Sequence, residues 1–246
     1  MGGFEEQFAA GPLDTARWIA SYLPAWSSRM AAAATYEIRA DGLRLSIPPD
    51  QPCWCAGLHD DPPLRVSAVQ SGNWSGPVGS TRGQQPFRAG QLVAEAQDEL
   101  RGFVPLYGRV AVECRAAIGP GSMFSAWLIG MEDEPERCGE ICLVEVFGET
   151  VADGTAAVGS GLHAFRDPKL TEEFTAPPLA IDVAEWHTYA VDWRRDGLDW
   201  YVDGVPTRTS SQSPDYPMLL ILGVFDFPRV SDPTFVPELV VRRVSG

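Results

Sequence analysis

Two glutamates inside one hydrophobic segment are the clearest sign of chemistry in this sequence. Residues 139–149 read Gly-Glu-Ile-Cys-Leu-Val-Glu-Val-Phe-Gly-Glu, which places Glu140 and Glu145 among the apolar and β-branched residues typical of a strand. A buried carboxylate is costly unless it is paired or has a function. The pair therefore indicates an active site, although a polar strand face open to solvent is the alternative that these residues alone leave open.

The spacing of the two glutamates sets a geometric condition. Side chains alternate along a strand, so Glu140 and Cys142 share a face, whereas Glu145 has the opposite parity. A β-bulge, which inserts one residue, would return Glu145 to the face of Glu140. The two backbone positions would then lie about 13 Å apart. Side chains leaning together would bring the carboxyls to roughly 5–6 Å, the separation in a retaining glycosidase.

Composition limits the classes of partner. The chain has 246 residues, a net charge of −14, 45% hydrophobic residues and eight Trp, which is ample for a globular core. The negative charge disfavours nucleic acid and anionic membranes. We expect a polysaccharide or oligosaccharide substrate, no nucleic-acid or membrane partner, and a monomer. No repeat or linker divides the sequence, so we expect residues 1–246 to form a single domain.

The strand pattern predicts an all-β fold. Short β-rich runs are separated by Pro and Gly, of which there are 21 and 24, and helical periodicity is nearly absent. We expect an antiparallel β-sandwich of about a dozen strands, with one face curved into a groove. Asp203-Gly204 predicts a hairpin turn. The predicted strands are 36–40, 43–47, 65–69, 92–97, 108–116, 124–130, 141–147, 157–163, 188–193, 198–202, 218–225 and 235–244.

The stretch 53–88 is the longest loop-rich region and is expected to form a wall of the cleft. Trp54 and Trp74 lie in it and are candidates for stacking against sugar rings, although a loop Trp can also merely cover its surroundings. Cys53, Cys55 and His59 lack a fourth ligand and the usual spacing of a zinc site, so we interpret these cysteines as free thiols. We expect no metal and no cofactor.

The cysteines and the amino-terminal residues indicate the cellular compartment in which we expect the protein. The number of cysteines, five, is odd, and Cys138 and Cys142 are too far apart in an extended run to form a bridge. No apolar run approaches the about 20 residues of a membrane span, and Met1 to Glu6 lack the basic and apolar regions of a secretory signal. As printed, the chain is expected to be cytoplasmic; a secreted protein with its signal removed is the alternative.

Several motifs together resemble glycoside hydrolase family 16, the β-jelly-roll endoglycanases. Glu140-Ile-Cys142-Leu-Val-Glu145 is similar to the family's Glu-x-Asp-x-x-Glu signature on a bulged strand. The resemblance runs from about residue 4 to residue 244. Its other motifs are Phe4-Glu-Glu-Gln-Phe8 with Trp18, Tyr107-Gly108-Arg109, Ala126-Trp127-Leu-Ile-Gly130, Trp186-His-Thr-Tyr-Ala-Val-Asp192-Trp193 and Asp199-Trp-Tyr-Val-Asp203-Gly204.

The resemblance implies a jelly roll with a concave substrate-binding cleft and a role for each matching residue. Glu140 would be the nucleophile and Glu145 the general acid/base of a retaining endo-hydrolase acting on a β-linked polysaccharide, a β-1,3- or β-1,3-1,4-glucan in the first instance. Trp127 would line the groove where sugar rings stack. His163 would either contact the substrate or be a hydrogen-bonded structural histidine. A transglycosylase, a non-catalytic carbohydrate-binding jelly roll and a structural sandwich are the alternatives.

The sequence departs from the family pattern at Cys142, which stands where the family has Asp. In the family this Asp hydrogen-bonds the nucleophile, whereas a thiol is a weaker donor and mostly neutral at pH 7. We therefore include Cys142 among the catalytic positions and predict slower turnover and an altered pH optimum. Met123 replaces a stacking Trp, which weakens the β-1,3-glucan assignment, and Val240 occupies the place of a calcium-binding Asp.

Overall fold

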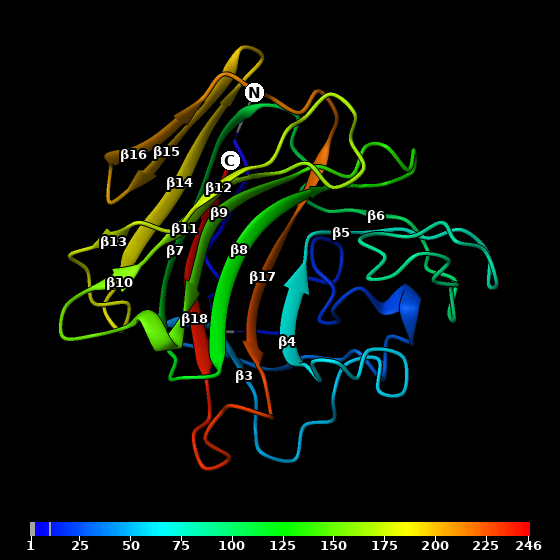
Figure 1. Cartoon of the computed structure of the whole chain (residues 1–246), viewed down its shortest axis with the longest axis horizontal. Helices are drawn as coiled ribbons and strands as arrows, with labels where there is room; N and C mark the ends of the chain where they lie inside the picture. The colour runs from blue at the N-terminus through cyan, green and yellow to red at the C-terminus, as the bar shows by residue number, and fades with distance from the viewer. Residues whose placement is uncertain (1–2, 10) are drawn as a thin grey trace.

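Two antiparallel β-sheets stacked face to face make up most of the computed structural model, which describes residues 3–9 and 11–246 (Figure 1). Met1, which the signal-peptide argument involves, lies outside the described residues. In spatial order the larger sheet contains β16 (Val205–Ser210), β15 (Gly197–Val202), β14 (His187–Arg194), β7 (Gly108–Ala117), β18 (Glu238–Ser245), β3 (Gly42–Ser46) and β2 (Thr35–Arg39), with β1 (Glu5–Glu6) paired to β18.

The second sheet carries the glutamates. Its order is β12 (Glu173–Thr175), β11 (Gly159–His163), β9 (Glu140–Phe147), β8 (Ser122–Gly130), β17 (Met218–Asp226) and β4 (Arg65–Gln70). Two small pairs, β10 (Ala156–Ala157) with β13 (Pro178–Leu179) and β5 (Gly72–Asn73) with β6 (Leu100–Arg101), and two 3₁₀ turns, η1 (Pro24–Trp26) and η2 (Gly148–Thr150), complete the elements. The predicted all-β antiparallel jelly-roll sandwich is confirmed.

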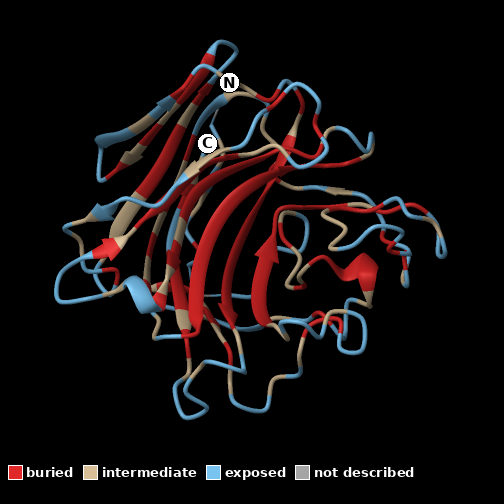
Figure 2. Cartoon of the chain, in the orientation of Figure 1, coloured by how far each residue is buried: buried red, intermediate tan, exposed pale blue. Residues whose placement is uncertain are grey.

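Both faces of the second sheet are buried, and each packs against a different hydrophobic cluster (Figure 2). Along β8, Phe124 and Leu128 pack into the core between the sheets, which we call the inter-sheet core. Trp127 and Ile129 face the other way, into a second group that we call the cleft-side cluster. The cleft-side cluster also contains Leu23, Ala25, Trp26, Ala32, Trp54, Cys55, Val66, Ala68, Val93, Met123, Met131, Cys142, Leu219, Ile221 and Phe225.

Loops from the first hundred residues supply the outer layer of the cleft-side cluster. In Figure 1 these blue-to-cyan segments gather beside β4, at one edge of the second sheet. Trp26 of η1 is fully buried there, and its indole N–H donates to the carbonyl oxygen of Gln84 at 2.8 Å. The loops are therefore anchored to one another as well as to the sheet, which lets them hold side chains over part of it.

Two local predictions have different outcomes. The Asp203-Gly204 hairpin is confirmed: Val202 pairs with Val205, and both turn residues have the positive φ, 51° and 77°, that a two-residue turn of this kind requires. The predicted strand 92–97 is wrong, because this segment is irregular. Val93 is buried in the cleft-side cluster while its apolar neighbour Leu92 is exposed, and the Val93 N–H donates to a loop carbonyl, that of Ser80, instead of to a neighbouring strand.

Two further sequence inferences concern cysteines and membrane spans. All five cysteines are free in the structure, so Cys138 and Cys142 are not bridged, as their spacing predicts. Within the part of the chain that the structure describes, no helix is both long enough and apolar enough to cross a bilayer.

Candidate active site

A bulge in β9 changes which way its side chains point. Cys142 pairs with Trp127 on β8, and Val144 pairs with Ala126, the residue next to Trp127. Leu143, which lies between Cys142 and Val144, is therefore an extra residue in β9 with no partner of its own on β8. Leu143 and Val144 consequently both pack into the inter-sheet core, although they are consecutive. The bulge that parity demands is thus present between the two glutamates.

Because of the bulge, Glu140 and Glu145 line one cavity of about 240 Å³ on the face of the second sheet that carries the cleft-side cluster. Glu140 is buried, with 8% of its surface exposed, and Glu145 is half-buried. The remaining lining residues come from β8, β17 and the surrounding loops: Tyr22, Leu64, Gln85, Met123, Ser125, Trp127, Phe225 and Phe227. Carboxylates in a largely aromatic and apolar wall suit a neutral ligand that presents both C–H faces and hydroxyls.

The cavity favours the protonated form of both carboxyls. Burial, followed by the nearby charge of Glu145, raises the pKa of Glu140 to about 8, and a hydrogen bond from Gln85 opposes the rise. Burial also raises the pKa of Glu145, while the nearby His163 lowers it. Since two close carboxylates disfavour each other's ionisation, the pair retains a proton near neutral pH. One carboxyl can then act as a nucleophile or base while the other acts as an acid.

Glu140 has two polar neighbours outside its own strand. The side-chain amide of Gln85 donates to Oε2 of Glu140 at 2.9 Å. Nε2 of His163, the cross-strand partner of Glu140 on β11, lies 3.9 Å from Oε1. His163 is itself oriented by Glu172, whose Oε1 is 2.6 Å from Nδ1, and its ring stacks on Phe174 at 4.7 Å. The structure thus brings His163 beside the predicted nucleophile.

Cys142 is fully buried between the two glutamates along β9, with its side chain on the cleft side of the sheet. Burial, and then the charges of Glu140 and Glu145, raise the pKa of this thiol well above its usual value. The thiol is therefore neutral. Its backbone carbonyl accepts a hydrogen bond from the indole of Trp200 at 2.9 Å, which ties this part of β9 to the larger sheet.

The three predicted tryptophans take different positions. Trp127 lines the cavity with the glutamates, packed against Phe225 at 5.9 Å between ring centroids. Trp54 lines an adjoining cavity of about 230 Å³, and its indole N–H donates to the carbonyl of Tyr22 at 2.9 Å. Trp74 lines neither of these cavities, and the guanidinium of Arg82 lies 5.1 Å from its ring centre. The structure brings Trp127 to the carboxylates, Trp54 next to them, and Trp74 to neither cavity.

Sequence reasoning missed several residues that line the cavity or support it. Tyr22 and Gln85 come from irregular loops, where no periodicity indicates which side chains point inward. Glu132 follows β8 in an acidic run, Glu132-Asp133-Glu134, that resembles an exposed turn, yet only 2% of its surface is exposed. A charged residue held inside a loop by long-range contacts leaves no local pattern by which sequence could find it.

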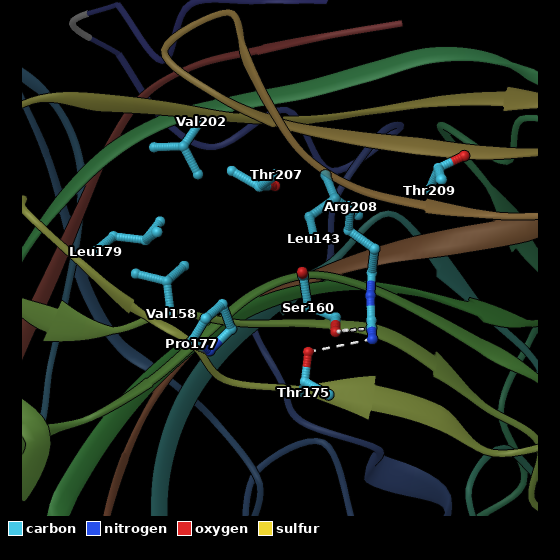
Figure 3. A pocket seen from close by; sticks show the side chains of 10 residues that line it. All are labelled: Leu143, Val158, Ser160, Thr175, Pro177, Leu179, Val202, Thr207, Arg208 and Thr209. Carbon is cyan, nitrogen blue, oxygen red and sulfur yellow. Dashed lines mark hydrogen bonds between the residues drawn. The ribbon is translucent and has the colours of Figure 1, made fainter.

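A separate cavity of about 270 Å³ lies at the edge between the two sheets, and neither glutamate lines it (Figure 3). Arg208 of β16 crosses it and donates to the carbonyl of Ser160 at 3.2 Å and to the hydroxyl of Thr175 at 3.1 Å (Figure 3). The guanidinium of Arg208 thus already has hydrogen-bond partners in backbone and hydroxyl groups of β11 and β12. Arg208 joins the two sheets at this edge, and the cavity is separate from the candidate active site.

Comparisons with solved structures agree with this architecture. The GlcNAcα1-4Gal releasing endo-β-galactosidase from Clostridium perfringens is similar over 98% of this chain and 61% of that chain, with 24% identity and a TM-score of 0.81. The laminarinase catalytic domain from Thermotoga maritima is similar over 98% of this chain and 95% of that chain, with 14% identity and a TM-score of 0.65. At these identities the likeness establishes the fold.

Comparisons of sequence identify the family. A "Crh-like protein" from Arthroderma benhamiae is 28% identical over 127 residues, which are 49% of this chain and 25% of that protein, so the match spans about a quarter of the curated relative. The family description "Glycosyl hydrolases family 16" matches residues 102–226. That segment is half of the chain and contains β7, β8, β9 and β17, hence both glutamates and the bulge between them. On this match the chain belongs to the glycosyl hydrolases of family 16.

Proposed function

We propose that this protein hydrolyses a β-linked polysaccharide internally and with retention of configuration. The observation that carries the proposal is the pair of glutamates that the β9 bulge brings to one open cavity. Glu140 attacks the anomeric carbon while Glu145 donates its proton to the departing glycosidic oxygen, which leaves a covalent glycosyl–enzyme. Glu145 then takes a proton from water, the water oxygen bonds to the anomeric carbon, and the Glu140 carboxylate leaves.

The surroundings of the two carboxyls support these roles. The Gln85 amide donates to Glu140, and a donor of this kind stabilises a carboxylate more than a protonated carboxyl. Glu145 is less buried than Glu140, which leaves it more accessible to a departing sugar and to incoming water. The proposed reactive form has the proton of the pair on Glu145 and the negative charge on Glu140, and the bond from Gln85 favours this form against the burial that raises the pKa of Glu140.

The substrate class follows from the wall of the cavity and from the relatives. Trp127 and Phe225 offer aromatic surface, and no positively charged side chain lines this cavity in the described chain, which favours neutral sugars. The two structural relatives named above are a laminarinase and an endo-β-galactosidase, and the second has the higher TM-score. We propose a β-1,3- or β-1,3-1,4-glucan or a β-galactoside as substrate, and residues 1–246 as one catalytic unit.

The test is release of reducing ends from a panel of β-glucans and β-galactans. We expect release from at least one polymer, with the β anomer formed first when the product is followed by proton NMR, and loss of release by at least about 1,000-fold in Glu140→Gln and Glu145→Gln. Glu149→Gln, which alters an exposed glutamate after β9, is the matched control and should keep full activity. Inverted product or unchanged activity in Glu140→Gln would refute the mechanism.

Two other outcomes would redirect the proposal. If a second sugar reaches the glycosyl–enzyme faster than water does, the products include longer oligosaccharides, and the protein is a transglycosylase that uses the same two glutamates. Binding of a glycan with no bond cleavage, unchanged in Glu140→Gln, would indicate a carbohydrate-binding jelly roll. The neutral Cys142 is the observation that keeps this last alternative open.

A further inference from the structure

Glu140 receives its hydrogen bond from a loop far away in the sequence. Gln85, 55 residues earlier, donates from Nε2 to Oε2 of Glu140 at 2.9 Å. Gln85 is half-buried and lines both the cavity of the glutamates and the adjoining one. It thus stands at the boundary between the two cavities with its amide turned to the carboxylate.

Gln85 is itself fixed by a buried carboxylate. Oε1 of Glu132 accepts the backbone N–H of Gln85 at 2.5 Å, and Oε2 of Glu132 pairs with the guanidinium of Arg166. Glu132 is 2% exposed, so this contact lies away from bulk water. Three segments, the loop of Gln85, the turn after β8 and the loop after β11, therefore meet at one side chain.

The backbone at this meeting point is in an unusual conformation. Gln85 has φ of 43° and Glu132 has φ of 55°, a left-handed region that residues with a side chain rarely occupy. Such conformations persist where surrounding contacts hold them, and they cluster at functional sites. Here the contacts are the Gln85–Glu132 hydrogen bond and, one residue earlier, the bond from the Trp26 indole to the carbonyl of Gln84.

β9 itself offers Glu140 no comparable donor. Cys142, on the same side of the sheet, is a neutral buried thiol, and among the described residues no hydrogen bond joins it to Glu140. His163 Nε2, at 3.9 Å from Oε1, is beyond hydrogen-bond distance. The amide of Gln85 is thus the hydrogen-bond donor that the described structure supplies to this carboxylate.

We propose that Gln85, held in place by Glu132, is the positioning residue that orients Glu140 for attack on the anomeric carbon. The attack rests on the proposed function; the hydrogen bond and its effect on Glu140 do not. A donor on Oε2 restricts rotation of the carboxyl group and leaves Oε1 to face the substrate. The same donor stabilises the negative charge that returns to Glu140 when the glycosyl–enzyme is hydrolysed.

The experiment compares Gln85→Met, which keeps the length of the side chain and removes the donor, with the wild-type protein. We expect kcat to fall roughly 10- to 100-fold, with KM within about three-fold. Because the donor lowers the pKa of Glu140, its removal should move the acid limb of the kcat profile upward by about one pH unit. Glu132→Gln, which keeps an acceptor for Gln85 but loses the charge facing Arg166, should change both quantities less and in the same direction.

Two measurements separate this role from a merely structural one. Gln91→Met is the matched control, because Gln91 is also a buried glutamine of the same loop region and lines neither cavity. It should leave kcat and the pH profile unchanged. Carboxyl carbon NMR of protein labelled at glutamate then follows the titration of Glu140 without any substrate, and Gln85→Met should raise its midpoint by about one pH unit.

The outcomes distinguish the inference from the proposed function. A rise in KM with unchanged kcat and unchanged titration would make Gln85 a substrate contact and overturn the positioning role. Equal loss of activity at every pH, with no change in the carboxyl titration, would make it structural and overturn it as well. If the wild-type protein cleaves no glycan, the proposed function fails, while the NMR titration still decides whether Gln85 controls Glu140.

Discussion

Replacing Glu140 with Gln should make the protein more stable at neutral pH, even though it removes the proposed nucleophile. The carboxyl group of Glu140 is buried, and its pKa is raised from 4.5 to about 8. The folded protein therefore keeps a proton that the unfolded chain has already released above pH 4.5. The free energy of unfolding must then fall as the pH rises from about 4.5 to about 8, and a neutral glutamine removes this dependence.

The size of the effect follows from the same shift. Each pKa unit corresponds to about 1.4 kcal/mol, so the penalty has a ceiling of about 3.5 kcal/mol at pH 7. The hydrogen bond from Gln85 is one of the influences that set this pKa, so its contribution is already included and is not subtracted again. We expect Glu140→Gln to gain up to about 3.5 kcal/mol at pH 7 and nothing near pH 4.5. For a chain of this size the ceiling corresponds to a rise in Tm of about 7–14 °C.

The assay is thermal or urea unfolding followed by circular dichroism at half-unit steps from pH 4.5 to 8.5. Glu149→Gln, an exposed change close to the end of β9, should leave the curve of stability against pH unaltered. A stability difference between Glu140→Gln and wild type that does not vary with pH would refute the reasoning. So would a variant that is less stable than wild type at pH 7, because burial of the charge would then not be what raises the pKa of Glu140.

Three further predictions concern the pH profile, Cys142 and a buried ion pair. Because burial raises the pKa of both Glu140 and Glu145, the kcat/KM profile should be bell-shaped, with an acid limb above pH 4.5; a limb below that value would contradict it. Cys142→Asp should speed turnover several-fold and move the pH optimum upward, because an added carboxylate raises the pKa values of Glu140 and Glu145. Cys142→Ser, which adds no charge, should not shift the optimum. An unchanged rate and pH profile in the Asp variant would refute this prediction. The buried Arg65 guanidinium lies 2.6 Å from the Asp226 carboxylate. Asp226→Asn leaves this guanidinium without its counter-charge and should lower the free energy of unfolding, measured in urea titrations, by about 3–5 kcal/mol. A loss under about 1 kcal/mol would show that the pair is hydrated.

Much of the fold could be predicted from periodicity. The strands of the two large sheets alternate or are continuously apolar, and the Asp203-Gly204 turn has a backbone signature that depends on two residues only. The segment 92–97 shows the limit of this reasoning. This apolar run begins like a strand, yet the segment buries Val93, exposes Leu92 and pairs with no strand, because burial is decided by what covers the segment.

For the candidate site, the two glutamates, their parity and hence the need for a bulge could be predicted from the sequence, because alternation is a property of any strand. The sequence also placed Cys142 between them. The groups that meet the carboxylates, by contrast, depend on contacts between distant parts of the chain. Gln85 and Glu132 are held by contacts across 55 and 47 residues of chain, and Trp74 faces Arg82 instead of the cleft. Such contacts depend on how irregular loops pack over a sheet, and that packing has no local period that a sequence could display.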